Sequence, residues 1–141
     1  MPRKHFVLIW GLIVAVTVGC GGNLKLVPVE GTVKLNGEPL SDARVVFYPE
    51  AGGRPSNART DADGRYSLEY IEGEPGALIG KHKVSISTFV EADPDSTDPL
   101  IKLGHRETLP AEYNKQTTLQ AELESGSREE VDFDLKAATG S

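Results

Sequence analysis

Cysteine is almost absent from this sequence, which has one, Cys20, among 141 residues. A single thiol excludes an intramolecular disulfide and any zinc site built from several cysteines. An excess of positive charge is missing too, because the formal net charge is −6. An acidic chain whose lysines are scattered among acids is not expected to bind nucleic acid. The fold must therefore be held together by packing alone.

Long apolar runs are also scarce. The apolar run near the N-terminus covers residues 6–19, and Arg3 and Lys4 precede it. Its fourteen residues fall short of the about 20 that a membrane-spanning helix needs, but they match the hydrophobic region of a signal peptide. The sequence therefore predicts a signal peptide over residues 1–19. A retained, uncleaved membrane anchor is the alternative.

The end of this run resembles the lipobox of bacterial lipoprotein signal peptides, whose usual form is Leu, a small residue, Gly or Ala, then Cys. Gly19 and Cys20 match that pattern, whereas Thr17 and Val18 stand where Leu and a small residue are usual. The resemblance implies cleavage between Gly19 and Cys20, with a diacylglycerol on the Cys20 sulfur and a tether over residues 20–26. Each buried methylene contributes ~0.8 kcal/mol, so long acyl chains hold a protein at a bilayer. We expect a domain outside the cytoplasm, lipid-anchored to a membrane of the cell envelope.

The remaining chain has the pattern of short strands. Apolar and polar residues alternate with the period of two that is typical of strands with one buried face. The segments are 27–35, 45–48, 66–70, 84–90, 119–123 and 131–135. Turn residues separate them, as in Asn36-Gly37 and the stretches 61–64, 73–76 and 124–127. A helix over 111–124 is the alternative for one region, but the alternation there favours a strand.

These strands predict an all-β fold, an antiparallel β-sandwich of about seven strands, transthyretin-like or immunoglobulin-like, over residues 27–136. A C-terminal tail of residues 137–141 follows. Phe47, Tyr66 and Phe133 are the large side chains that we expect to fill the space between the sheets. Gly31 within a strand predicts a bulge or a close backbone approach.

Four motifs in order resemble the carboxypeptidase regulatory-like domain, a transthyretin-like sandwich. They are residues 29–33 (VEGTV), 36–40 (NGEPL), 43–49 (ARVVFYP) and 60–66 (TDADGRY). Two later stretches, 80–86 (GKHKVSI) and 109–114 (LPAEYN), look like motifs of small bacterial lipoproteins that carry this domain. The resemblance implies a binding, adaptor or folding module, usually without catalytic residues of its own.

Two acidic clusters are interpreted as structure and not as metal sites. In the first, Asp61, Asp63 and Glu69, glycine follows Asp63 directly and a strand begins, which is typical of a hairpin turn and not of a calcium loop. In the second, prolines interleave with Asp93, Asp95 and Asp98, which predicts an open, solvated, mobile loop. We expect no bound metal and no cofactor.

The histidines are the remaining candidates for a site. His82 shares the parity of the inward residues but begins a strand, where a partly exposed histidine is ordinary. His105 lies in the long segment 91–112, and loops of that length are often functional. The sequence therefore predicts a ligand-contacting patch formed by His105, Arg106 and Tyr113.

The function predicted from these features is a lipid-anchored, non-enzymatic module that mediates protein or glycan interactions in the envelope. One alternative is a transthyretin-like hydrolase, which requires His82 and His105 to converge in a pocket. The chain ends in Gly-Ser but lacks the full Tyr-Arg-Gly-Ser ending of that enzyme. Another alternative is an accessory folding or stability domain without a ligand.

Overall fold

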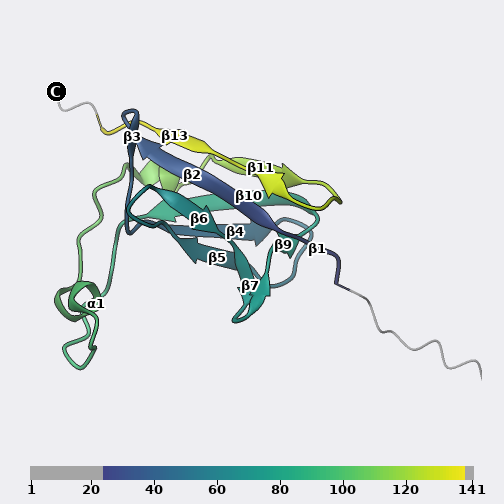
Figure 1. Ribbon diagram of the computed structural model, residues 1–141. Coiled ribbons are helices and arrows are strands. Elements are labelled where there is room, and N and C mark those ends of the chain that lie inside the picture. Colours follow the sequence, from purple (N-terminus) through teal and green to yellow (C-terminus); the bar gives the residue numbers. More distant parts are fainter. Residues whose placement is uncertain (1–23, 139–141) are drawn as a thin grey trace, which may run out of the picture.

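The computed structural model describes residues 24–138 (Figure 1). The predicted signal peptide, residues 1–19, and the predicted lipid attachment at Cys20 lie outside the described residues. None of the helices in the described part has the length and apolar character needed to cross a bilayer.

The chain folds into two β-sheets that enclose one core, which confirms the predicted all-β sandwich (Figure 1). The larger sheet has six antiparallel strands. In spatial order they are β11 (Gln120–Leu123), β10 (Gly80–Ser87), β4 (Arg44–Pro49), β5 (Ser56–Arg59), β7 (Glu69–Ile71) and β8 (Glu74–Pro75). β5 was not predicted, because its four residues carry no apolar alternation; its pairing with β4 makes it a strand.

The smaller sheet is built around β2 (Val29–Leu35). Its other strands are β12 (Glu129–Glu130), β13 (Phe133–Leu135), β6 (Arg65–Ser67) and β3 (Glu38–Pro39). A separate two-stranded ladder joins β1 (Leu26–Val27) to β9 (Ala77–Leu78). Asn36 and Gly37 both have positive φ, 52° and 84°, which confirms the tight turn predicted between β2 and β3.

The two C-terminal strands run parallel to β2, although the sequence predicted antiparallel pairing throughout. Phe133 pairs with Val33, and Glu129 pairs with Val29. The chain reaches β12 from β11, which belongs to the other sheet, so no hairpin links these strands to β2. Their direction is set by this crossing between sheets, which local turn residues do not encode.

At Leu68 the chain crosses from the smaller sheet to the larger one. The Leu68 amide donates to the Val29 carbonyl of the smaller sheet at 2.9 Å, and its own carbonyl accepts from Gly76 N, next to β8, at 2.7 Å. The side chain is fully buried. The strand predicted over 66–70 is therefore two strands, β6 and β7, because the alternation continues across the change of sheet.

Four rings meet in the core. The centroid of Phe47 lies 6.5 Å from that of Tyr66, 6.2 Å from Phe133 and 5.7 Å from His82. Edge-to-face and tilted contacts of this kind add to the free energy of apolar burial. The prediction that Phe47, Tyr66 and Phe133 fill the space between the sheets is confirmed.

The prediction of a partly exposed His82 is wrong, because the side chain is only 1% exposed. β10 lies between β4 and β11, whose Pro49 and Ala121 are the register partners of His82. The ring Nε2 lies 2.6 Å from the Leu78 carbonyl oxygen. His82 is thus a core residue.

Segment 91–112 is also more ordered than its prolines predicted. It contains helix α1 (Pro99–Leu103), and the 3-10 turn η1 (Ala111–Tyr113) begins at its end. Asp98 caps α1 by accepting a hydrogen bond from Leu100 N at 2.8 Å. The backbones of Val90 and His105 exchange two hydrogen bonds, so the segment is folded back on itself. Only η1 is helical in the region where a longer helix was the alternative.

Candidate functional site

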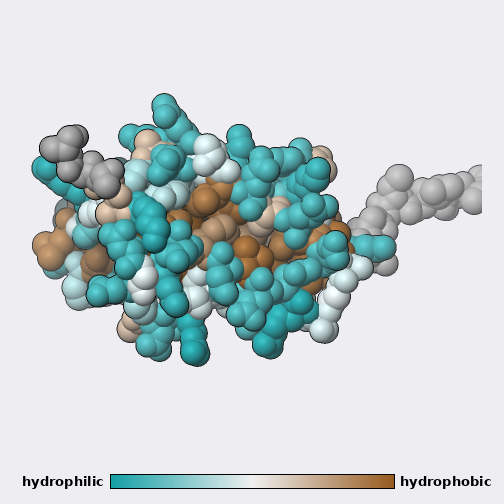
Figure 2. Space-filling model, turned by 90° about the horizontal axis from the view of Figure 1, so that it is seen from above, coloured by the Kyte–Doolittle hydropathy of each residue, from teal (hydrophilic) through white to brown (hydrophobic). Residues whose placement is uncertain are grey.

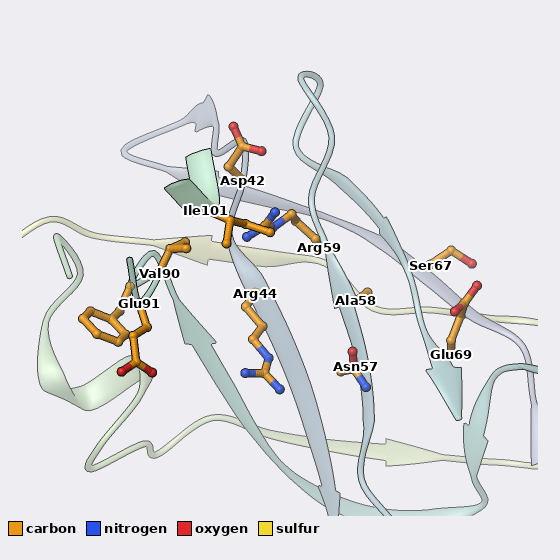
Figure 3. A pocket seen from close by; sticks show the side chains of 11 residues that line it. Asp42, Arg44, Asn57, Ala58, Arg59, Ser67, Glu69, Val90, Glu91 and Ile101 are labelled. Atoms are coloured by element: carbon orange, nitrogen blue, oxygen red, sulfur yellow. The ribbon is translucent and has the colours of Figure 1, made fainter. Parts of the chain in front are cut away.

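A groove of about 700 Å³ crosses one end of the outer face of the six-stranded sheet (Figure 3). Strands β4, β5 and β7 form its floor, and the chain after β10 together with α1 forms one side. We call it the sheet-end groove. The lining residues are Asp42, Arg44, Asn57, Ala58, Arg59, Ser67, Glu69, Phe89, Val90, Glu91 and Ile101.

Two arginines lie opposite each other on the floor of this groove. Arg44 of β4 and Arg59 of β5 are register partners, and both are exposed. Like charges directly opposite each other destabilise a sheet. Neither guanidinium forms an ion pair or a hydrogen bond with another side chain of residues 24–138. The two cations are therefore available to an external anion.

The other lining groups suit a polar ligand with one apolar face. Val90, Glu91 and Ile101 lie on one side of Arg44, and Asn57 and Glu69 lie on the other (Figure 3). Phe89, also in the lining, is a large apolar side chain that is 56% exposed. A groove with an aromatic side chain and several planar polar groups can hold a ring and bind its substituents by hydrogen bonds.

The predicted patch of His105, Arg106 and Tyr113 does not line one cavity. His105 lines a smaller hollow of about 300 Å³, which shares Asp42 and Val90 with the sheet-end groove. Tyr113 packs against the core, and its hydroxyl accepts a hydrogen bond from Lys136 N at 3.0 Å. Arg106 is exposed and lines neither hollow.

The structure does not bring His82 and His105 together. His82 is buried in the core, whereas His105 is exposed and its Nδ1 lies 3.1 Å from the Thr88 carbonyl oxygen. Thr88 lies six positions after His82 along β10 and its continuation, which is about 20 Å at the rise of an extended chain. The convergence that the hydrolase alternative requires is absent. Among residues 24–138, no cluster of three or more histidine, cysteine or acidic side chains is arranged to hold a metal ion.

The Glu107 carboxylate accepts hydrogen bonds that stabilise the segment bordering the sheet-end groove. Its Oε1 accepts hydrogen bonds from Thr88 N at 3.1 Å, from Thr88 Oγ1 at 2.8 Å and from Leu109 N at 3.0 Å. Its Oε2 accepts from the Ser87 hydroxyl. Burial alone would raise the pKa of the Glu107 carboxyl, but these hydrogen bonds outweigh burial and hold the pKa below its ordinary value of 4.5.

Acid is therefore expected to loosen this segment. A carboxyl whose pKa is lower in the folded than in the unfolded protein stabilises the fold at any pH above its unfolded-state pKa. This stabilisation is lost as the pH falls through the folded-state pKa. Glu107→Gln should lower the free energy of unfolding by about 1 kcal/mol at pH 7. The difference between the variant and the parent should shrink below pH 4.5. Urea unfolding from pH 7 to pH 3 measures this, and a difference independent of pH would contradict the role assigned to the carboxylate.

Comparison with known proteins adds no family: no family model, curated protein or solved structure matches the chain. Sequence reasoning missed Arg44, Arg59 and Phe89. The register that places the two arginines opposite each other is a tertiary property, and no motif marks it.

Proposed function

We propose that this chain is a lipid-anchored, non-enzymatic module of the bacterial cell envelope that binds a carboxylate-bearing glycan in the sheet-end groove. Residues 1–19 serve as the signal peptide, and Cys20 carries the diacylglycerol. The proposed family is the carboxypeptidase regulatory-like domain, on the motifs at 29–33, 36–40, 43–49 and 60–66. That family's binding and adaptor roles agree with this reading.

The observation that carries the proposal is the pair Arg44 and Arg59, opposed across two strands without ion-pair partners in residues 24–138. Guanidinium groups bind carboxylates with two parallel hydrogen bonds, and this geometry is stronger than neutral hydrogen bonding. A uronic acid residue supplies such a carboxylate on a ring. Its hydroxyls would face Asn57 and the groove acids, and its C–H face would pack on Phe89.

The charge of the glycan is the basis of the test. The probe is an oligogalacturonate, and its methyl ester is the control ligand, since the ester keeps the sugar chain and loses the negative charge. We expect the full-length protein in neutral detergent to bind the acid and not the ester in calorimetry. Arg44→Gln removes a charged hydrogen bond worth about 1.5 kcal/mol or more, which corresponds to about a tenfold or greater loss of affinity.

Arg106→Gln is the matched control, because it removes the same charge from an exposed position outside the groove. Its affinity should stay within about twofold of the parent, as expected for a rim or remote charge. Equal binding of acid and ester, or equal losses in the two variants, would overturn the proposed site.

A further inference from the structure

A second groove, of about 630 Å³, lies over β2 and β6 of the smaller sheet. We call it the β6 groove. Its lining includes Thr32 of β2, Arg65 and Ser67 of β6, and Arg59 of β5. Arg59 and Ser67 also line the sheet-end groove. The two grooves therefore adjoin and form one continuous cleft, which leads from the larger sheet to the smaller sheet.

The tight turn between β5 and β6 places Arg59 and Arg65 in the same groove. Asp61 N donates to the Arg65 carbonyl at 2.9 Å, and Asp61 Oδ1 accepts hydrogen bonds from Asp63 N at 2.9 Å and from Arg65 N at 3.0 Å. Gly64 completes the turn with a φ of 73°. Because backbone hydrogen bonds hold Arg65 at the start of β6, its exposed side chain is presented from a fixed position.

Two of the arginines in the β6 groove are not engaged by acids. The charged residues that line this groove are Arg59, Arg65, Arg128, Glu30, Asp61 and Glu130. Arg128 pairs with Glu30 at 3.4 Å, and Asp61 Oδ1 is occupied by two backbone amides. Within residues 24–138, neither Arg59 nor Arg65 forms an ion pair.

The other acids around Arg65 do not compete for it. Strands β12 and β6 flank β2 on opposite sides, so Glu130 lies two strand spacings away, or about 10 Å. Asp132 accepts a hydrogen bond from Thr32 N at 2.8 Å. Asp63, in the turn, does not line the groove. The Arg65 guanidinium is therefore available to an external anion, as are the two on the floor of the sheet-end groove.

The lining of the β6 groove is polar. In the part of the chain that the structure describes, no aliphatic side chain belongs to this lining, and its one aromatic ring, Tyr66, is only 4% exposed. Apolar side chains gather elsewhere on the surface, as in the strip that Figure 2 shows between two hydrophilic borders. Charged and strongly polar groups therefore suit the β6 groove, and an acidic glycan supplies them as carboxylates and hydroxyls.

We propose that a linear glycan with a carboxylate on successive sugar units occupies the whole cleft, with one carboxylate at Arg44 and Arg59 and a later one at Arg65. The inference rests on the proposed function, because the sheet-end groove supplies the first of the two contacts. It adds that the ligand is a polyanionic chain and not a single acidic sugar. Arg65 would hold the later carboxylate by two parallel hydrogen bonds. The Ser67 hydroxyl would meet the sugar between the two contacts.

Two contacts on one ligand raise its affinity, because the second contact forms within an already bound complex. The test measures the ratio of the affinity of hexagalacturonate to that of digalacturonate, by calorimetry on the full-length protein in neutral detergent. A hexamer can also place its units in one groove in more ways than a dimer, but this statistical gain is the same in every variant. Arg65→Gln should lower the ratio by about tenfold. It should leave the affinity of the dimer within about twofold of the parent, which also shows that the variant is folded.

Arg106→Gln is the matched control, because it removes the same charge from an exposed position that lines neither groove. Its ratio should stay within about twofold of the parent. The comparison separates a contact at Arg65 from the loss of long-range attraction that follows removal of any positive charge.

Three results would overturn the inference. A ratio unchanged by Arg65→Gln would show that the glycan does not reach the β6 groove, and the proposed function would stand if binding of the dimer still depended on Arg44. An equal fall of the ratio in the Arg65 and Arg106 variants would show that net charge alone decides it. Absence of binding by both oligomers would overturn the proposed function together with this inference.

Discussion

Replacing Gly31 by alanine is expected to lower the free energy of unfolding by about 3 kcal/mol or more. A Cβ at this position would lie 1.8 Å from the Val131 carbonyl oxygen and 2.7 Å from its carbonyl carbon. These are backbone atoms, so no side-chain rotation relieves the clash. The sequence predicted a bulge or close approach at Gly31, and the close approach is confirmed.

The Gly31→Ala substitution would also disturb two hydrogen bonds of the Val131 backbone. Its carbonyl accepts a hydrogen bond from the Tyr66 hydroxyl at 2.5 Å, and its amide donates to Glu30 O at 2.9 Å. Moving Val131 away from a new methyl group strains both bonds and leaves a buried tyrosine hydroxyl without its acceptor. Such an orphaned buried group costs about 1–3 kcal/mol.

Thermal unfolding followed by circular dichroism measures the effect, and we expect the midpoint to fall by about 10 °C or more. Gly126→Ala is the matched control, since a Cβ there meets nothing within 4 Å. It should change the free energy of unfolding by less than about 0.5 kcal/mol. Similar midpoints for the two variants would contradict the close contact at Gly31.

Cys20→Ser is expected to move the protein from the membrane fraction to the soluble fraction of its native host. The variant cannot form the proposed thioether. Loss of two or more long acyl chains, at ~0.8 kcal/mol per methylene, removes on the order of 20 kcal/mol of membrane affinity. Carbonate extraction followed by immunoblotting measures the distribution.

Thr17→Leu serves as the control, because it restores the residue that is usual at that place in the lipobox and should leave the protein on the membrane. Intact mass of the parent should show loss of residues 1–19 and the added mass of acyl chains. If the serine variant stays membrane-bound, the uncleaved segment is the anchor and the lipid proposal is wrong.

The sequence correctly predicted the strands in which apolar and polar side chains alternate. It did not predict features that depend on which strands pair with each other. The apolar positions of β2, β10 and β13 follow the period of two, so their inward faces were correctly assigned. β5 offers only Ser, Asn, Ala and Arg, and its place depends on β4. The change of sheet at Leu68 leaves the alternation intact, so no local signal marks it.

The candidate site was harder to predict, because register and topology form it. Arg44 and Arg59 are fifteen positions apart in the chain, and only the pairing of β4 with β5 sets them side by side. His105 was singled out by loop length and does line a hollow beside the groove. His82 had the parity of an inward residue, but its position at the strand start outweighed that signal.

The parallel pairing of β2 with β13 also determines how the domain bears mechanical load. The chain enters β2 at Val29 and leaves β13 at Leu135, at opposite ends of these two neighbouring strands. Tension between the two termini therefore pulls these neighbours lengthwise past each other. The hydrogen bonds between β2 and β13 share that force in shear and are not opened one after another.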